Sequence, residues 1–354
     1  MLRKLAAIIL AASLSLPFIP ATQAAPKKDF KICWSIYVGW MPWGYLSDSG
    51  IMKKWAEKYG INVEITRIND YVESINQYTA GGFDGCAMTN MDALSIPAGG
   101  GIDTTALIIG DFSNGNDAVI LKDKAALKDI AGQKVNLVEL SVSHYLLARA
   151  LETVGLAEKD ITVVNTSDAD MVAAYGTSDV TSVVTWNPMV SEIVAIPGAN
   201  KVFDSTQIPG EIIDMMVVNT ETLKDNPALG KALVGAWYEA MALMTSGSPE
   251  GKAAKEEMAK ASGTDLAGFD AQLATTAMFF EPAKAVDFTK GTELPKTMDL
   301  VRNFLFTHGI LGTNAPSVDV IGMSFPDGST LGDANNVKLR FDPAFMAQAA
   351  AGTL

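Results

Sequence analysis

The stretch GQKVNLVELSVSHYLLARALETVGLAEKDITVVNT, residues 132–166, decides the fold. Its beginning, GQKVNLVEL, is typical of a buried strand, and its end, DITVVNT, is typical of a second one. Between them, SVSHYLLARALETVG has apolar residues at helical spacing and ends at a glycine. A strand, a helix and a strand in this order predict two parallel strands joined by a right-handed crossover.

The same alternation continues on both sides of this stretch. Before it we expect strands over 31–39, 61–68, 84–90, 104–112 and 117–122, with helices over 50–60 and 71–82. After it we expect a helix over 168–177, strands over 180–186 and 214–220, and then a mostly helical third of the chain. The length allows about two domains of roughly 150 residues. The sequence therefore predicts an α/β fold made of two similar units without a linker.

The N-terminus has the pattern of a secretory signal peptide. Arg3 and Lys4 precede the apolar run LAAIILAASLSLPFIP, and ATQA offers small residues for cleavage after Ala24. We expect residues 1–24 to be removed and the protein to be exported to a bacterial periplasm. No cysteine near that point could carry a lipid.

The charge balance excludes some partners. Without Arg3 and Lys4 the basic count falls from 27 to 25 against 40 acidic residues, so the formal net charge changes from −13 to −15. Nucleic acid is excluded because its phosphates need basic clusters. Two histidines without Cys/His spacing give no case for a metal site, and no cofactor motif is present. Cys33 and Cys86 leave an optional disulfide open, although a bridge between neighbouring parallel strands is sterically awkward.

Large aromatic side chains cluster in the segment KICWSIYVGWMPWGY, residues 31–45. Its first half alternates like a strand, but Pro42 and Gly44 interrupt the pattern. We therefore place Trp40, Trp43 and Tyr45 on a loop at the carboxyl end of the strand, where α/β sheets hold their ligands. Trp186 follows a later strand and would face the same cleft. The alternative is that these rings only pack in the core.

Three segments resemble a known family. YTAGGFDGCAMTN (78–90), LKDIAGQKVNLVELSVSHYLLARALETVGLAEKDITVV (127–164) and VVTWNPMV (183–190) resemble periplasmic solute-binding proteins for nitrate, sulfonates and taurine. The match runs from about Lys31 to Leu223. The fuller pattern from ICWSIYVGWMPWGY to EIIDMMVVN is most similar to the binding proteins associated with urea carboxylase, for which guanidine is also a proposed solute.

The resemblance implies a two-lobed periplasmic binding protein of type II, with a mainly parallel sheet in each lobe and the ligand in the cleft. Lobe 1 would comprise residues 28–116 and 219–354, and lobe 2 residues 117–218, with crossings near Asp117 and Met216. It further implies a small-molecule solute, an ABC transporter permease as membrane partner, and a monomer. A sensor subunit that contacts a receptor instead of a permease stays open. The sequence does not decide whether the segment 317–348 reaches the cleft.

Polar candidates for the site follow the predicted strands. The segment LVELSVSHYLL suggests Glu139, Ser143 and His144, because a helix N-terminus there suits an anion and Glu139 would occupy or oppose that position. The alternative is a helix-start acid beside an ordinary cap at Ser141. The remaining candidates lie near other strand ends: Asn90, Asp92, Asp111, Asn187, Glu211 and Asp214. For each of these acids a cap, turn or hinge contact is the alternative, and for Asp117 we favour it.

These segments contain carboxylates but no Lys or Arg, so a small anion would lack a countercharge. A planar cation such as guanidinium could stack on tryptophan and bind carboxylates, and urea could use the same groups. The sequence therefore predicts a binding protein for guanidine or urea. The alternatives are a binding protein for nitrate or a sulfonate, and an enzyme resembling pyrimidine-precursor synthases, for which Glu139 and His144 would form an acid/base pair. No nucleophile motif supports the enzyme.

Overall fold

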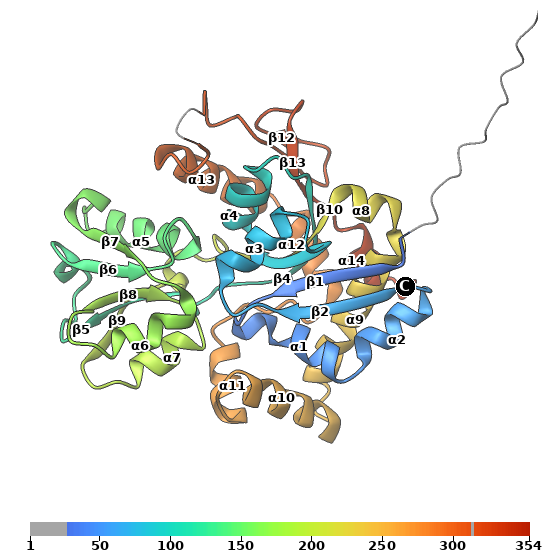
Figure 1. Ribbon diagram of the computed structural model, residues 1–354, viewed down its shortest axis with the longest axis horizontal. Helices are drawn as coiled ribbons and strands as arrows, with labels where there is room; N and C mark the ends of the chain where they lie inside the picture. Colours follow the sequence, from blue (N-terminus) through green and yellow to red (C-terminus); the bar gives the residue numbers. More distant parts are fainter. Residues whose placement is uncertain (1–26, 313–314) are drawn as a thin grey trace, which may run out of the picture.

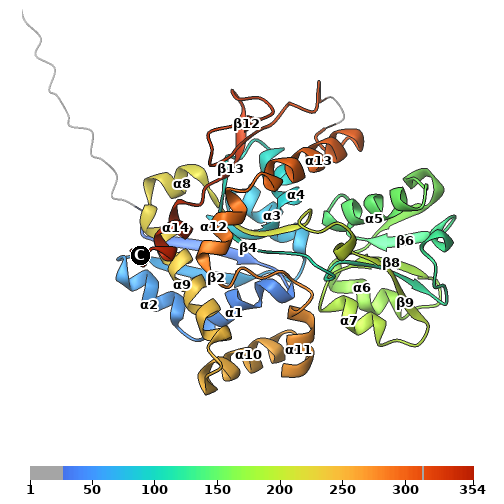
Figure 2. The same cartoon turned by 180° about the vertical axis from the view of Figure 1, so that it is seen from behind.

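The computed structural model describes residues 27–312 and 315–354. The signal peptide predicted for residues 1–24 lies outside the described residues. Two sheets, each flanked by helices, form two lobes that lie side by side (Figure 1), and the view from behind shows the same division (Figure 2). This arrangement confirms the predicted two-lobed α/β fold.

The larger sheet has eight strands in the order β12-β11-β13-β4-β10-β3-β1-β2. The strands are β1 Asp29–Trp34, β2 Asn62–Arg67, β3 Gly85–Thr89, β4 Thr104–Phe112, β10 Ile213–Asn219, β11 Gly322–Ser324, β12 Thr330–Leu331 and β13 Val337–Phe341. β10 runs antiparallel to both its neighbours, β3 and β4, while β1 is parallel to β2 and β3. β10 therefore brings the chain back into this sheet from the other lobe.

The smaller sheet has five strands in the order β7-β6-β8-β5-β9. They are β5 Ala118–Lys122, β6 Lys134–Leu137, β7 Thr162–Asn165, β8 Ser182–Thr185 and β9 Ala199–Asp204. β6 is parallel to β7 and β8, as residues 132–166 predict, whereas β5 is antiparallel to β8 and β9. β9 was not predicted from the sequence.

Helices cover both sheets. They are α1 Met41–Asp48, α2 Ile51–Lys58, α3 Tyr71–Thr79, α4 Asn90–Ala93, α5 Val142–Thr153, α6 Met171–Tyr175, α7 Met189–Val194, α8 Thr220–Asp225, α9 Pro227–Thr245, α10 Pro249–Ala261, α11 Leu266–Leu273, α12 Pro282–Thr289, α13 Glu293–Thr307 and α14 Ala344–Ala350. In the smaller lobe α5 lies on one face of the sheet, with α6 and α7 on the other (Figures 1 and 2). None of the helices in the described residues is long and apolar enough to span a membrane.

The aromatic segment near the N-terminus differs from its prediction. β1 ends at Trp34, residues 38–40 form a 3-10 helix, and α1 begins at Met41. The predicted loop is therefore wrong for Trp43 and Tyr45, which lie in α1. Pro42 sits in the first turn of α1, where a missing backbone N–H costs no hydrogen bond and the fixed φ suits a helix.

Two segments connect the lobes. The first joins β4 to β5, and the second, residues 205–212, joins β9 to β10. Because β10 already lies in the larger sheet, we place the second crossing before Ile213 rather than near Met216. The lobe boundaries stay a proposal.

Cys33 and Cys86 form a disulfide. They are paired residues of the adjacent strands β1 and β3, with their Cα atoms 4.4 Å apart. Cys33 lies near the carboxyl end of β1, whereas Cys86 lies near the amino end of β3. The bridge therefore ties two neighbouring strands inside the larger lobe and leaves the movement between lobes free.

Candidate functional site

A small cavity lies where the two lobes meet. Its lining residues come from both lobes and from the crossings: Tyr37, Trp40, Tyr71, Thr89, Asp117, Val142, Trp186, Ile212 and Asp214. Its volume is about 250 Å³. The space suits a ligand of few heavy atoms and leaves no room for a long chain.

Four aromatic rings form the apolar wall of the cavity. The centroid of Trp40 lies 5.0 Å from that of Tyr37 and 5.7 Å from that of Tyr71. Trp186, from the other lobe, lies 5.6 Å from Tyr71 at an interplanar angle of 73°. The four side chains are almost fully buried. Rings at different angles around one space present several negative faces to a cation.

Two carboxylates face each other across neighbouring strands. Asp214 of β10 is the paired residue of Asp111 on the antiparallel strand β4. Both side chains are buried, and the Oδ2 atom of each has no hydrogen-bond partner in the described residues. Tyr37 donates its hydroxyl to Oδ1 of Asp111 at 2.6 Å. Directly opposed residues have Cβ atoms about 5 Å apart, so these two acids interact strongly.

Two more buried carboxylates complete the acidic group. Asp117, at the first crossing, accepts a hydrogen bond from the Ser113 hydroxyl at 2.6 Å. Asp92 of α4 accepts a bond from the Tyr71 hydroxyl at 2.7 Å through Oδ2. The same oxygen accepts the backbone N–H of Val142, the first residue of α5, at 3.4 Å. A carboxylate of one lobe thus occupies the N-terminus of a helix in the other lobe.

The surroundings disfavour the ionised form of all four acids. Burial raises the pKa of Asp92 and of Asp111 to about 6. Burial, followed by the charges of Asp111 and Asp92, raises the pKa of Asp117 to about 7. Burial, followed by the charges of Asp111 and Asp117, raises the pKa of Asp214 well above its ordinary value. Removal from water and mutual repulsion both favour the neutral acid.

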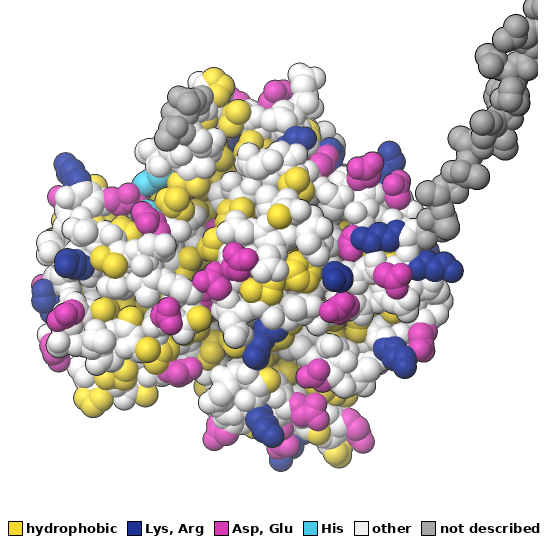
Figure 3. Space-filling model, in the orientation of Figure 1, with side chains coloured by type: hydrophobic (Ala, Val, Ile, Leu, Met, Phe, Trp, Pro, Cys, Tyr) yellow, Lys and Arg dark blue, Asp and Glu magenta, His cyan; other side chains and the backbone are white. Residues whose placement is uncertain are grey.

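No basic side chain offsets these acids. The charged neighbours that influence the pKa values of the four aspartates are other aspartates, and no Lys, Arg or His is among them. On the face drawn in Figure 3, by contrast, acidic and basic side chains are interspersed. The described residues contain no group of His, Cys, Asp or Glu arranged to hold a metal ion.

Hydrogen bonds across the cleft show that the lobes are closed. Val38 N–H donates to the carbonyl of Asn187 at 3.2 Å, and Trp186 Nε1 donates to the carbonyl of Ile36 at 3.0 Å. A third bond between the lobes runs from Tyr71 N–H to Asp168 Oδ1 at 3.1 Å. The two lobes are therefore held together around the cavity by contacts that an open form would lose.

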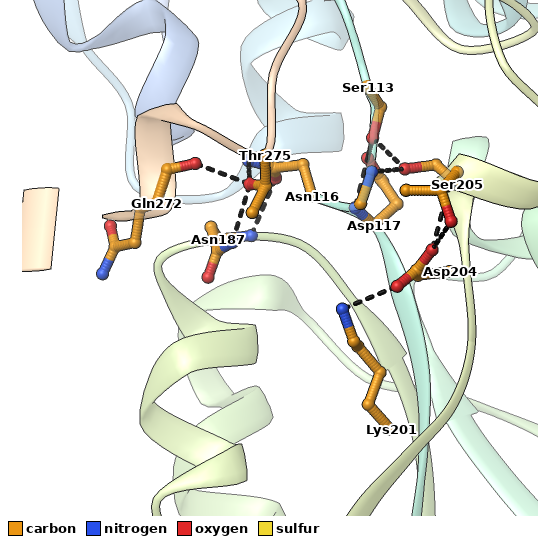
Figure 4. A network of polar contacts seen from close by, with 11 residues as sticks. Ser113, Asn116, Asp117, Asn187, Lys201, Asp204, Ser205, Gln272 and Thr275 are labelled. Carbon is orange, nitrogen blue, oxygen red and sulfur yellow. Dashed lines mark hydrogen bonds and ion pairs between the residues drawn. The ribbon is translucent and has the colours of Figure 1, made fainter. Parts of the chain in front are cut away.

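Side chains also connect the crossings to the larger lobe. Thr275, which follows α11, accepts hydrogen bonds from the side-chain amides of Asn116 and Asn187 at 3.0 and 3.2 Å (Figure 4). The hydroxyls of Ser113 and Ser205 lie 2.6 Å apart and join the two crossing segments. Asn187 therefore supports the closed conformation and does not line the cavity.

The structure brings part of the expected site together. Trp40, Trp186 and Asp214 line the cavity, and Asp111 and Asp92 contact lining residues from behind.

Two of the expected rings lie elsewhere. Trp43 stacks on Trp237 with centroids 4.9 Å apart inside the larger lobe. Tyr45 lines a different pocket, next to α10. Neither forms part of the cavity, because α1 turns both side chains away from it.

The polar candidates around α5 do not line the cavity. The Glu139 side chain is exposed and lines a different pocket. His144 Nε2 lies 2.8 Å from Oε1 of Glu158, away from the cavity. Ser143 is buried, its hydroxyl has no partner among the described residues, and it does not line the cavity. Ser141 caps α5, as its alternative interpretation expects.

Glu211 and Asn90 have structural contacts instead. Arg149 binds Glu211 through Nε and Nη2, at 2.9 and 3.1 Å, which neutralises that carboxylate. The Asn90 side chain bonds to the Glu211 carbonyl and to the N–H of Ile213, at 3.1 and 3.0 Å, and so fixes the second crossing. None of the lining residues comes from the segment 317–348.

Sequence reasoning missed six of the nine lining residues: Tyr37, Tyr71, Thr89, Asp117, Val142 and Ile212. The sequence favours a cap, turn or hinge contact for Asp117, but the residue also lines the cavity. Tyr71 follows the carboxyl end of β2, so the rule that found Trp40 could have found it. Tyr37 was read as part of the strand, and only the early end of β1 places its ring beside Trp40.

Comparison with known proteins agrees with the fold. Residues 34–262, well over half of the chain, match the NMT1-like family. This chain belongs to that family. The taurine-binding periplasmic protein of Escherichia coli (strain K12) is 23% identical over 138 residues. That match spans 38% of this chain and only 42% of the length of the curated relative.

Solved structures share the architecture. The alkanesulfonate-binding protein SsuA from Xanthomonas axonopodis pv. citri, bound to MOPS, superposes with a TM-score of 0.67 at 14% identity, covering 81% of this chain and 96% of that one. The periplasmic nitrate-binding protein NrtA from Synechocystis PCC 6803 gives a TM-score of 0.58 at 14% identity, covering 93% and 100%. At this identity the likeness establishes the periplasmic binding protein fold alone.

Proposed function

We propose that this chain is the solute-binding component of an ABC importer and that it captures guanidinium between its lobes. The observation that carries the proposal is the cavity itself, where buried carboxylates and aromatic rings meet without a basic side chain. A buried charge needs a partner of opposite sign, and a bound cation would supply it.

The chemistry of guanidinium fits the two walls of the cavity. Its flat face can stack on Trp40 or Trp186, where a desolvated cation gains about 2 kcal/mol. Its N–H groups can donate to the free oxygen of Asp214 and to Asp117. Planar N–H donors and carboxylates form charge-assisted bonds, which are about twice as strong as neutral ones. Its few heavy atoms also suit the small volume.

A small anion, such as a sulfonate or nitrate, fits poorly. It would need backbone N–H groups at the N-terminus of α5, because no basic side chain is available there. Asp92 Oδ2 already accepts the Val142 N–H at that helix end. An incoming anion would compete with this carboxylate and be repelled by the other three. The solutes named for the relatives are therefore not carried over to this chain.

Urea is the second candidate because of one orphaned donor. Trp40 Nε1 is buried and has no acceptor among the described residues. Urea has a carbonyl oxygen that could accept this N–H, whereas guanidinium has no acceptor. Urea, however, would leave the carboxylates without a countercharge, and for this reason we rank it second.

An enzyme is disfavoured by the position of the groups that it would use. The acid/base pair drawn from Glu139 and His144 does not form, because Glu139 is exposed and His144 binds Glu158. Export to the periplasm, a permease as membrane partner and a monomeric state complete the proposal. A receptor in place of the permease would leave the binding step unchanged.

Isothermal titration of the purified protein, unfolded and refolded to remove bound solute, tests the proposal. Guanidinium, urea, taurine and nitrate are titrated in turn, with sodium chloride as the ionic control. We expect guanidinium to bind more tightly than urea, and taurine and nitrate to give no heat of binding. The exposed variant Glu139→Gln should bind as the unmodified protein does. Tight binding of an anion with no response to guanidinium would overturn the proposal.

A further inference from the structure

The facing pair Asp111 and Asp214 suggests how the site is kept neutral before it is filled. The two residues are paired across β4 and β10, are buried, and keep their Oδ2 atoms free of other hydrogen bonds. The Asp111 side chain lies close to the main chain at Gly39, because a Cβ added to Gly39 would lie 2.6 Å from Oδ2 of Asp111. The pair therefore has little room to separate.

The charged groups near this pair oppose a second negative charge, whereas the one hydroxyl that donates to it, that of Tyr37, favours ionised Asp111. The segment before α1 contributes Tyr37, whose hydroxyl bonds to Asp111. The first crossing contributes Asp117, whose charge acts on Asp214. α4 contributes Asp92, which acts on Asp117. Two carboxylates this close in a dry site hold one proton between them.

We propose that Asp111 and Asp214 share a proton in the ligand-free closed site and that an incoming cation takes its place. This inference rests on the proposed function, because it requires a cationic solute. Asp214 lines the cavity and contacts the ligand, whereas Asp111 lies behind it and acts through Asp214 as a positioning residue. The solute is thus taken up in exchange for a proton.

The exchange balances in charge and atoms. Before binding, the pair carries one proton and a net charge of −1. On binding, the proton leaves the carboxyl pair for water or buffer, and both carboxylates become ionised. With the cation in place the net charge is again −1, and no covalent bond of the solute changes. The closed cleft therefore has the same charge whether it is filled or empty.

This exchange predicts selectivity that stacking alone does not. A neutral solute such as urea cannot replace the proton, so its binding would release none. A cation must compete with protons, so its affinity would fall about tenfold per pH unit on the acid side of the upper pKa of the pair. Burial, followed by the charge of Asp111, raises the pKa of Asp214 well above its ordinary value, as a shared proton requires.

Calorimetry in buffers of different ionisation enthalpy measures the proton directly. Guanidinium is titrated at about pH 7 in phosphate and in Tris, and the difference in heat gives the protons released. We expect about one proton per guanidinium and none per urea. Asp214→Asn should bind guanidinium more weakly and release no proton, while Asp204→Asn, an acid paired with Lys201 away from the cavity, should behave as the unmodified protein.

The outcomes separate the two proposals. Guanidinium binding without proton release, and with affinity independent of pH, would overturn the exchange and leave the proposed function standing. Absence of guanidinium binding would overturn both. If Asp214→Asn does not fold, carboxyl ¹³C resonances of the unmodified protein replace it. The pair should titrate in two separated steps, and guanidinium should remove the upper step; two ordinary carboxyl titrations would refute the shared proton.

Discussion

Two tryptophans three residues apart should respond in opposite ways to the same substitution. Trp40 lines the cavity and is 4% exposed, while Trp43 is 1% exposed and stacks on Trp237 in the larger lobe. We expect Trp40→Leu to weaken guanidinium binding. Its loss of stability should be limited to the packing contacts of the Trp40 ring itself. We expect Trp43→Leu to lower stability and leave the affinity unchanged.

The magnitudes follow from what each ring contacts. A desolvated cation over a tryptophan face gains about 2 kcal/mol, which corresponds to about a 30-fold change in Kd at ~1.4 kcal/mol per factor of ten. Trp43 has no ligand contact, but truncating a buried ring of this size costs on the order of 2–4 kcal/mol in the free energy of unfolding. The two effects are large enough to be measured separately.

Titration calorimetry gives the affinity of each variant, and thermal melting gives its stability. Unfolding by urea is avoided because urea is itself a candidate ligand. Trp40→Phe keeps a ring and should recover part of the affinity, which distinguishes stacking from bulk packing. Unchanged affinity in Trp40→Leu, or an equal loss in Trp43→Leu, would refute the assignment of Trp40 as the stacking ring.

Three further outcomes are expected. Gly39→Ala should weaken guanidinium binding about tenfold, because the new Cβ would press on Asp111. Gly235→Ala, which crowds Trp55 outside the cleft, should lower the melting temperature without changing the Kd for guanidinium. Equal affinities of the two variants for guanidinium would contradict this prediction. His308 of the larger lobe lies 3.1 Å from Glu158 of the smaller one, and the hydrogen bond to Glu158 raises the pKa of His308. His308→Gln should therefore weaken binding two- to fivefold (roughly 0.5–1 kcal/mol) at about pH 6 and hardly at pH ~8.5. The same loss at both pH values would exclude an ion pair. The pKa values of the four buried aspartates are raised above their unfolded values, so the native state binds more protons than the unfolded chain. The ligand-free melting temperature should therefore fall as the pH rises from about 5.5 to 8, and guanidinium should raise it most at the upper end. A melting temperature that climbs over this range would show that these acids are not buried together in solution.

The order of strands and helices was determined by local sequence. Residues 132–166 form β6, α5 and β7 where the periodicity places them, because a buried parallel unit needs apolar strands and an amphipathic helix at fixed spacing. The end of β1 was not determined in this way. Ile36 and Val38 continue the alternation of a strand, but the chain turns into a helix there because the aromatic side chains pack against residues far along the sequence.

The sequence also determined that the cleft is acidic, since its segments contain carboxylates and no Lys or Arg. Which acids meet was decided by the tertiary structure alone. Asp111 and Asp214 are about a hundred residues apart and become neighbours only because β10 returns antiparallel beside β4. Glu139, next to a helix start, looked equally suitable, yet α5 leaves it in solvent while Asp92 reaches that helix end from the other lobe. Local patterns fix what a segment can form, but the charge and shape of a site between lobes depend on contacts between segments that no local pattern encodes.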